Sequence, residues 1–378
     1  LAVVRSLGRR GIPVWVLYAG DDVLAARSRF TSKRLPLEGE RDDERARFLL
    51  SLAEEHGLEG WTLFPTGDET VAMVARAHDQ LQERFLLTSP PWPVLRWADD
   101  KRLTYSLAES LSIPTPRTWA AASAAEAGSL PLEFPVIVKP AVKEELNALT
   151  AAKAWRAGDR DELTARFAEA ASLLDASLVM IQELIPGGGE TQFSYAALCD
   201  GGRPLATVVA RRTRQYPADF GRASTFVETI ECPEIVDPSE RLLAEIRFNG
   251  LVELEFKRDP RDGQFKLLDI NPRVWGWHSL CQRAGVDFPY LAFRLARSEP
   301  VPASRSQIGV SWLRLSTDLP TSLREIARGR LSAVGYLRSL FSKHDSAVFA
   351  RDDPWPALLE FPMLAGTFLR RLRRGDAV

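Results

Sequence analysis

Apolar and polar residues alternate through residues 251–277 in two runs that flank a short turn. Alternation with a period of two, interrupted by an Asp-Gly pair, is typical of a β-hairpin. The pattern therefore predicts two antiparallel strands joined near Asp262. The alternating apolar positions are Val252, Leu254, Phe256, Leu268 and Ile270, and the turn is Asp262-Gly263.

A hairpin centred on Asp262 places Glu255 directly opposite Asp269, with their Cβ atoms about 5 Å apart. Two carboxylates at that distance repel each other, and strand periodicity puts Asn271 and Arg273 on the same face as Asp269. A hard divalent cation such as Mg²⁺ would relieve the repulsion, because it takes oxygen ligands and shares them with substrate phosphates. Arg273 would then hold a phosphate oxygen. The alternative is an ordinary hairpin whose acidic side chains are solvated.

Helical and strand patterns alternate through residues 1–95 and predict one small α/β domain. A helix ending at Gly11 precedes the apolar strand PVWVLYAG, a second helix covers residues 43–56, and WTLFP is a second strand. Residues 66–69 (TGDE) offer N-cap chemistry to a third helix. In a parallel α/β unit a strand and a glycine turn normally precede the first helix, and here they would lie upstream of Leu1.

Two lysines lie at the ends of predicted elements. Lys101 is in the first turn of a helix that Asp99 or Asp100 caps and that Pro114 ends. A cation there is unfavourable to the helix dipole unless an anion is also bound, so a solvated position is the favoured interpretation of Lys101 alone. Lys139 ends the apolar strand FPVIVKPA, and because lysines are rarely buried without a partner, it favours an anion-binding role.

The stretch after Lys139 is predicted to change from helix to strand. Residues 143–158 have the composition of a helix, with Lys143 and Lys153 as further cations. The run LVMIQELIPGGGETQFSYAAL at 178–198 predicts two strands joined by its three glycines as a plain hairpin turn. Such a turn would position Glu190 at its end.

Arginines follow an apolar strand within residues 205–224. Arg211, Arg212 and Arg214 would emerge beside the acidic hairpin, where an anionic substrate needs cationic partners. A charged surface strand is the alternative interpretation.

The last hundred residues are mostly helical in pattern. Residues 279–296 predict two helices around Gly285, and residues 298–378 predict further helices. The chain ends in an apolar stretch followed by Arg370, Arg371, Arg373 and Arg374. Such a basic amphipathic end can dock on an anionic membrane, but packing against the rest of the protein is the favoured interpretation.

The chain has 378 residues, enough for about two or three domains. Its 49 Lys and Arg nearly balance 50 Asp and Glu, which gives no support to a nucleic-acid partner. Cys199, Cys232 and Cys281 match no zinc spacing and indicate buried or free thiols in a reducing compartment. No apolar run reaches the roughly 20 residues of a membrane span, and no secretory signal pattern is present. We therefore expect a cytoplasmic protein.

The order of four features over residues 99–296 resembles the ATP-grasp superfamily, and most closely its carboxylate–amine ligase-like members. The features are Lys101, Lys139, QELI at 182–185, and the hairpin with Glu255, Asp269, Asn271 and Arg273. The hairpin ending in Asp-x-Asn-Pro-Arg is the strongest part of the resemblance.

The resemblance implies a multidomain α/β and α+β fold. Residues 1–95 would form the Rossmann-like domain that precedes ATP-grasp in this family, and residues 99–296 the ATP-grasp domain itself. The ATP-grasp domain would comprise a lid subdomain at about 115–185 and a metal-binding catalytic subdomain at about 186–296. Residues 297–378 would be a mostly helical extension outside the resemblance.

The resemblance also implies a role for each candidate residue. The residues implied to bind ATP are Lys101 and Lys139 for the α- and β-phosphates, the backbone of Glu183, Leu184 and Ile185 for the adenine edge, and Glu190 for the ribose hydroxyls. The residues implied to bind Mg²⁺, or Mn²⁺ in its place, are Glu255, Asp269 and Asn271. The residues implied to act on the transferring phosphate or the substrate carboxylate are Arg273, Arg212 and Arg214.

The implied reaction begins when a small-molecule carboxylate attacks the γ-phosphate of ATP. The acyl phosphate that forms is then attacked by an amine, and ADP and phosphate are released. Two alternatives stay open, an ATP-dependent phosphotransferase on the same fold and a nucleotide-binding module without turnover. The sequence departs from the family in having Asp269 where many members carry Glu, and in lacking a glycine-rich flap after Lys139, so that Lys143 or Lys153 would close the lid.

Overall fold

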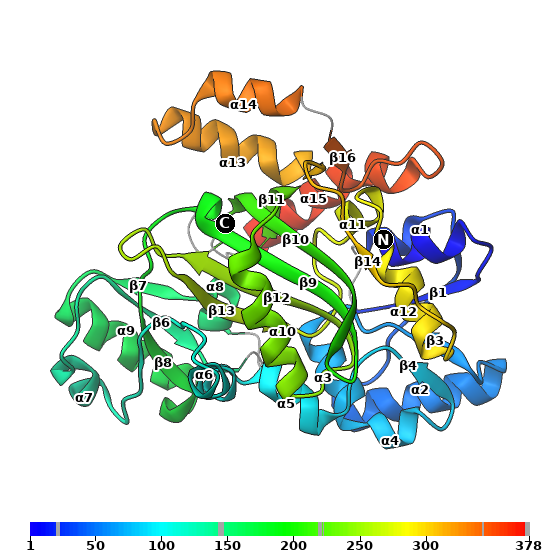
Figure 1. Ribbon diagram of the computed structural model, residues 1–378, viewed down its shortest axis with the longest axis horizontal. Coiled ribbons are helices and arrows are strands. Elements are labelled where there is room, and N and C mark those ends of the chain that lie inside the picture. The colour runs from blue at the N-terminus through cyan, green and yellow to red at the C-terminus, as the bar shows by residue number, and fades with distance from the viewer. Residues whose placement is uncertain (20–22, 143–146, 218–220, 222, 342–343, 375–378) are drawn as a thin grey trace.

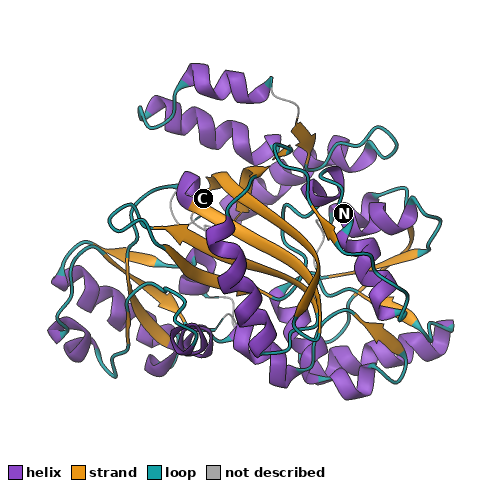
Figure 2. Cartoon of the chain, in the orientation of Figure 1, coloured by secondary structure: helices purple, strands orange, loops and turns teal. Residues whose placement is uncertain are grey.

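The computed structural model describes residues 1–19, 23–142, 147–217, 221, 223–341 and 344–374 (Figure 1). Most of the described strands belong to an eight-stranded sheet and a four-stranded sheet, and two parallel strand pairs lie in the N-terminal region. Figure 2 shows helices packed around these sheets.

The N-terminal region has the α/β character that its sequence predicts. Strand β1 (Val14–Tyr18) pairs in parallel with β2 (Thr31–Pro36), and β3 (Trp61–Leu63) pairs in parallel with β4 (Phe85–Leu87). The helices of this region are α1 (Ala2–Gly8), α2 (Asp42–His56), α3 (Asp68–Arg76), α4 (His78–Leu81) and α5 (Trp92–Asp99). Leu49, Met73 and Leu81 of these helices are buried in one core with Phe85 of β4. The Rossmann-like arrangement stays a prediction.

The four-stranded sheet has the strand order β5-β8-β6-β7. Its strands are β5 (Thr118–Trp119), β6 (Val136–Pro140), β7 (Trp155–Ala157) and β8 (Val179–Glu183). The helices beside it are α7 (Ala124–Ser129), α8 (Ala148–Ala152) and α9 (Arg160–Leu173). Val138, Phe167 and Ile181 form its buried core.

The helix predicted over residues 143–158 is wrong for most of its length. Helix α8 has five residues and ends where Lys153 adopts a positive φ of 67°. The chain then forms β7, which pairs with β6, because the apolar and aromatic side chains here pack into the sheet core. Lys143 lies outside the described residues.

The eight-stranded sheet has the order β13-β12-β9-β10-β11-β15-β16, with β14 beside β10. Its strands are β9 (Gln192–Asp200), β10 (Arg203–Tyr216), β11 (Ala223–Thr229), β12 (Gly250–Arg258), β13 (Phe265–Asn271), β14 (Ser304–Arg305), β15 (Ser311–Leu313) and β16 (His344–Ser346). One face packs on α6 (Lys101–Ser110) and α10 (Val236–Glu245), and the other on α1, α11 (Ser279–Arg283) and α12 (Phe288–Ala296). Cys199, Cys232 and Cys281 are buried and free, as predicted.

The three glycines at 187–189 do not form the plain hairpin turn that the sequence predicts. Strand β8 belongs to the four-stranded sheet and β9 to the eight-stranded sheet, so this segment crosses from one sheet to the other. A Cβ atom on Gly189 would lie 2.7 Å from the carbonyl oxygen of Arg212, which only glycine permits. The glycines therefore allow a close passage between the sheets.

The hairpin of β12 and β13 has the predicted register. Glu255 lies opposite Asp269, and Glu253 lies opposite Asn271. The register shifts by one residue beyond Glu255, toward the turn at Gly263, whose φ is +76°. The two acidic residues and the amide therefore share one face of the sheet.

The segment after residue 297 is more closely joined to the sheet than predicted, because it contributes β14, β15 and β16. Its helices are α13 (Leu315–Ala327), α14 (Ala333–Leu340) and α15 (Trp355–Arg374). Helices α13 and α14 lie at the top of the molecule in Figure 1. Among the helices in the described part of the chain, none has the length and apolar content of a membrane span.

Candidate active site

A cavity of about 1230 Å³ opens between the N-terminal region, the two sheets and α13. The structure brings all of the predicted site residues to its walls. They are Lys101, Lys139, Glu183, Leu184, Ile185, Glu190, Arg212, Arg214, Glu255, Asp269, Asn271 and Arg273. Their individual roles stay predictions, but their convergence on one cavity supports treating them as one site.

The predicted metal ligands lie against two buried cations. The Lys101 ammonium is 3.0 Å from the Asp269 carboxylate, and Arg212 is 2.6 Å from the Glu255 carboxylate. Lys101 begins α6, and its backbone amide donates to the carbonyl of Ala141, so the strand end and the helix start meet here. A lysine at a helix N-terminus is unfavourable unless an anion lies beside it. In this structure Asp269 is that anion.

Glu253 is a third carboxylate of this site, and the sequence analysis missed it. Its Oε1 accepts hydrogen bonds from the Ser194 hydroxyl at 2.8 Å and the Trp277 indole at 2.9 Å, and its Oε2 accepts one from Asn271 at 3.2 Å. Burial, together with the charge of Glu255, raises the pKa of Glu253 to about 7. The signal that could have found it is the strand alternation itself, which puts residues 253 and 255 on one face.

Lys139 is buried and held by two neutral groups. Its ammonium donates to the Tyr105 hydroxyl at 2.9 Å and to the Gln182 amide oxygen at 3.0 Å. The Gln182 amide in turn donates to the Thr118 hydroxyl at 2.9 Å, which fixes its orientation. Burial raises the pKa of Tyr105 to about 12, so its hydroxyl stays protonated beside the lysine. Tyr105 was not predicted from the sequence, and Gln182 only as part of the QELI segment, since the contacts join α6, β6 and β8.

The segment predicted to meet adenine lies at the end of β8. The Leu184 amide donates to the carbonyl of Pro135 at 3.4 Å, and within the described part of the chain we see no hydrogen bond from the Ile185 amide. A backbone amide at the wall of a cavity can donate to a nitrogen of an adenine ring. The arrangement is compatible with the predicted role of Ile185.

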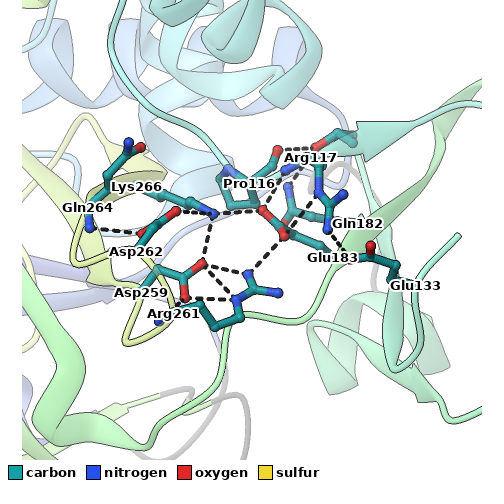
Figure 3. A network of polar contacts seen from close by, with 11 residues as sticks. Pro116, Arg117, Glu133, Gln182, Glu183, Asp259, Arg261, Asp262, Gln264 and Lys266 are labelled. Atoms are coloured by element: carbon teal, nitrogen blue, oxygen red, sulfur yellow. Dashed lines mark hydrogen bonds and ion pairs between the residues drawn. The ribbon is translucent and has the colours of Figure 1, made fainter.

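The Glu183 side chain belongs to an ionic network rather than to the cavity alone (Figure 3). It accepts hydrogen bonds from Lys266 at 3.0 Å and from Arg261 at 2.9 Å, both on the β12–β13 hairpin. The same two cations bind Asp259, at 2.8 Å and 2.5 Å respectively. Burial raises the pKa of Glu183, but its hydrogen bonds outweigh that effect and lower the pKa overall. The network therefore ties the end of β8 to the hairpin.

Glu190 lies beside the glycine segment that crosses between the sheets. Its carboxylate accepts a hydrogen bond from the Gly188 amide at 2.8 Å, and Lys257 donates to the carbonyl of Gly187 at 2.7 Å. Lys153 also lines the cavity, and its ammonium donates to the carbonyl of Gly221 at 3.2 Å. The predicted role of Lys153 in closing the lid stays open.

Arg273 joins the hairpin to the N-terminal region. Its guanidinium forms a bidentate pair with the Asp68 carboxylate, at 2.7 and 3.0 Å. Asp68 is the first residue of α3 and was predicted only as part of the helix cap. A residue predicted to steady a phosphate is therefore already oriented by a carboxylate from a distant segment.

Arg214 is a predicted site residue whose side chain contacts the C-terminal helices. It forms a bidentate pair with the buried Asp318 of α13, at 2.8 and 2.9 Å, and donates to the Ser339 hydroxyl of α14 at 3.0 Å. It also lies 5.1 Å from the ring of Tyr336. These contacts favour a role in anchoring the C-terminal helices, and its role in binding a carboxylate stays a prediction.

Trp275 and Trp277 are both 2% exposed in the core behind the site. Trp275 packs against Phe288 with ring centroids 5.0 Å apart. His278, between this core and the chain's first residues, has its pKa lowered to about 4 by burial. It therefore stays neutral near pH 7.

The side chains of the cavity supply part of the ligand set that a divalent cation needs. Within the described residues, no three His, Cys, Asp or Glu side chains are arranged as a metal site by themselves. The predicted set has two carboxylates and one amide, and Mg²⁺ commonly completes its shell with waters and substrate phosphates. If ionised, Glu253, Glu255 and Asp269 exceed the positive charge of Lys101 and Arg212. A divalent cation would offset this excess of negative charge.

Comparison with known proteins identifies the fold that carries this cavity. The family described as "ATP-grasp in the biosynthetic pathway with Ter operon" matches residues 177–315, which extend from β8 to β15. This family model matches the part of the chain that contains the acidic hairpin. The ATP-grasp fold predicted from the sequence is confirmed.

This ATP-grasp chain is similar to two curated ligases. It is 22% identical to D-aspartate ligase of Enterococcus faecium (strain Aus0004) over 271 residues, which cover 68% of the chain and 64% of that ligase. It is 28% identical to D-alanine–D-alanine ligase of Pseudomonas entomophila (strain L48) over 316 residues, which cover 78% of the chain and 85% of that ligase. The chain thus spans slightly less than two thirds of the D-aspartate ligase. These names support the prediction of a ligase-like enzyme that forms carbon–nitrogen bonds.

A solved structure shares the fold over most of the chain. The L-amino acid ligase from Bacillus licheniformis superimposes with a TM-score of 0.60 at 17% identity, covering 78% of this chain and 70% of that chain. At this identity the similarity establishes the fold alone.

Proposed function

We propose that this ATP-grasp chain is an ATP- and Mg²⁺-dependent ligase that joins a small-molecule carboxylate to an amine. The observation that carries the proposal is the placement of Glu255 opposite Asp269, beside Asn271, in a cavity that also contains the buried cations Lys101 and Arg212. Opposed carboxylates within reach of buried cations suit a metal-bound phosphate chain better than a neutral ligand.

Each predicted ATP contact has a matching group in the cavity. Lys101 and Lys139 would hold the α- and β-phosphates, since both ammonium groups are buried and reach the cavity wall. The Ile185 amide would bind the adenine edge, and Glu190 would accept hydrogen bonds from the ribose hydroxyls. Mg²⁺ held by Glu255, Asp269 and Asn271 would neutralise charge on the phosphates.

The chemistry asks for positioning and charge neutralisation rather than a protein nucleophile. A substrate carboxylate would attack the γ-phosphate of ATP, giving an acyl phosphate and ADP. An amine would then displace phosphate from the acyl group and form the carbon–nitrogen bond. Arg273, oriented by Asp68, would contact the transferring phosphate, and Arg212 would lie close to the acyl phosphate.

The names of the curated relatives suggest where to look for substrates. One ligase is named for D-aspartate and the other for D-alanine. We therefore infer that the carboxylate and the amine are first to be sought among amino acids and short peptides.

A trapping experiment tests this proposal. The chain is incubated with ATP, Mg²⁺, hydroxylamine and a panel of amino acids, and both ADP and hydroxamate are measured. We expect one carboxylate to stimulate ADP release and to yield a hydroxamate, because hydroxylamine intercepts an acyl phosphate.

The Asp269→Asn variant is the control, and it should lose both products. A stable phosphoester without hydroxamate would overturn the ligase proposal in favour of a phosphotransferase. ATP binding without ADP release for any substrate would indicate a nucleotide-binding module.

A further inference from the structure

Helix α13 has its polar side toward the protein and an apolar side outward. Asp318 and Ser322 are buried, and Asp318 pairs with Arg214. Leu319 and Leu323 are 40% and 56% exposed. An amphipathic helix of a globular protein normally buries its apolar side, so this outward stripe lacks its usual cover.

Helix α14 continues the same feature. Helix α14 buries Tyr336 and exposes Val334 and Leu337, which are 66% and 53% exposed. Of fourteen large apolar side chains exposed in the described part of the chain, eleven lie between residues 315 and 364. We call the six that lie between residues 315 and 341 the C-terminal apolar face; they are Leu315, Leu319, Leu323, Val334, Leu337 and Phe341.

Charge on α13 and α14 has one sign at the surface. Between residues 315 and 341 the exposed charged residues are all arginines, namely Arg324, Arg328, Arg330 and Arg338. The two acids of this segment pair with arginines: buried Asp318 with Arg214, and Glu325 with Arg328 and Arg330. Arg324 and Arg338 are exposed and add positive charge beside the C-terminal apolar face.

We propose that the C-terminal apolar face docks on the surface of an anionic lipid membrane. Helices with Leu, Phe and Trp on one side and Arg beside them lie in the interface of a bilayer, with the apolar side chains below the headgroups. Anionic headgroups attract the arginines at the same time. At 13 and eight residues, α13 and α14 suit a position along the surface.

A second copy of the chain is the competing occupant, and the charges disfavour it. A twofold interface brings the same patch of both copies together, so arginines at the border of one copy would meet those of the other. Like charges brought together in this way oppose association. A bilayer with anionic headgroups satisfies the apolar side chains and the arginines together.

Vesicle flotation of the full chain tests the proposal. Vesicles of phosphatidylcholine alone are compared with vesicles containing phosphatidylglycerol, at low and high salt. We expect binding to the anionic vesicles that weakens with salt. In the Leu319→Glu/Leu337→Glu variant we expect the binding constant to fall at least about tenfold, because charges replace two exposed leucines that would enter the bilayer.

Two further variants keep the outcome interpretable. Arg324→Gln/Arg338→Gln leaves the apolar side chains in place, and its binding to anionic vesicles should fall several-fold. Leu173→Glu introduces one charge at a leucine that is 37% exposed on α9, far from this face, and should bind as the parent does.

Three results would overturn the proposal. The parent chain could fail to bind anionic vesicles, or the Leu319→Glu/Leu337→Glu variant could bind them as well as the parent. Light scattering could also show a dimer that the leucine variant dissociates, which would assign the face to a second copy.

Discussion

Glu253 sets the orientation of the Asn271 amide at the candidate metal site. The amide nitrogen of Asn271 donates to both Glu253 and Glu255, at 3.2 and 2.9 Å, so the amide oxygen is directed away from the two carboxylates. An amide oxygen is the atom that a hard cation binds. A carboxylate that contacts no metal can in this way decide whether Asn271 is a ligand.

We predict that Glu253→Gln weakens magnesium binding without removing any ligand. The new amide oxygen can accept from Ser194 and Trp277, which turns the new amide nitrogen toward the amide nitrogen of Asn271. Two donors then face each other, and Asn271 would have to rotate. The Mg²⁺ concentration that gives half of the maximal ATP-dependent stabilisation should rise about 10- to 100-fold, as for other residues that orient metal ligands.

Ser194→Ala is the matched control for this prediction. It removes a hydrogen bond to Glu253 but leaves the carboxylate that Asn271 contacts. The magnesium requirement should stay near that of the parent. An unchanged requirement in Glu253→Gln would contradict the orienting role.

At the scale of single residues, the sequence predicted the pairing within the hairpin. It did not predict the side chains that hold the carboxylates of the hairpin in place. The pairing of Glu255 with Asp269 follows from alternation and the position of one turn, and it is confirmed. The contacts of Glu253 with Ser194 and Trp277 come from β9 and from the loop after β13. No local pattern encodes such contacts, because they depend on which strands become neighbours.

The ionic network of Glu183 is the main polar link between β8 and the β12–β13 hairpin (Figure 3). Lys266 has a side chain that is 10% exposed and contacts Glu183 and Asp259 together. We predict that Lys266→Met lowers the free energy of unfolding at pH 7 by about 1 to 3 kcal/mol, since it leaves two buried carboxylates short of a donor.

This loss should depend on pH in a defined direction. The pKa values of Glu183 and Asp259 are lowered in the folded protein, so their stabilisation is complete above the unfolded carboxyl pKa of about 4. It disappears as the pH falls through the lower folded values. Urea unfolding should therefore show a larger difference between parent and Lys266→Met at pH 7 than at about pH 3.

Arg166→Met is a suitable comparison for the lysine variant. Arg166 pairs with Glu169 on α9, and both side chains are about half exposed, at 47% and 50%. An exposed pair of this kind contributes little, at most about 1 kcal/mol. A pH-independent loss in Lys266→Met would contradict the account of the network.

Helices and strands were predicted well where their own residues determine the structure. They were predicted poorly where contacts with a distant segment determine it. The glycine segment at 187–189 has the composition of a turn, yet β8 and β9 join different sheets. Helix α13 exposes its leucines, and Asp318 faces inward because Arg214 lies there. Both outcomes depend on residues about 20 to 100 positions away, which periodicity does not register.

The first and last parts of the chain meet at Asp353, just before α15. Its carboxylate is fully buried and accepts hydrogen bonds from the Arg5 guanidinium at 2.9 Å, the Ser28 hydroxyl at 2.7 Å and the Arg29 amide at 2.9 Å. The neighbouring Asp352 pairs with Arg9 at 2.8 Å at the surface. The adjacent residues Asp353 and Asp352 therefore form one buried and one exposed ion pair with the same N-terminal segment.

We predict that Asp353→Asn lowers the free energy of unfolding by about 3 kcal/mol, because the buried Arg5 loses its counter-charge. Asp352→Asn should lower it by at most about 1 kcal/mol, since water replaces an exposed pair at little cost. Urea unfolding of both variants measures the difference. Equal effects would contradict the view that Asp353 joins the two ends of the chain.

At the scale of the whole molecule, the sequence predicted which residues share a site but not how the segments close around it. The cavity receives Asp68 from α3 and Glu325 from α13, neither of which was a candidate. Their positions follow from the pairing of Asp68 with Arg273 and of Asp318 with Arg214. Such ion pairs connect segments that no motif links.

Thermal unfolding measures whether Glu255, Asp269 and Asn271 bind Mg²⁺ together with ATP. The parent, Asp269→Asn and the hairpin-turn variant Asp262→Asn are each unfolded with ATP, with and without Mg²⁺. At a hundred times its dissociation constant, the nucleotide should add about 2.7 kcal/mol to the stability of the parent and of Asp262→Asn, only when Mg²⁺ is present. This gain should be much smaller in Asp269→Asn. No gain in the parent, or an equal gain in Asp269→Asn, would contradict the account.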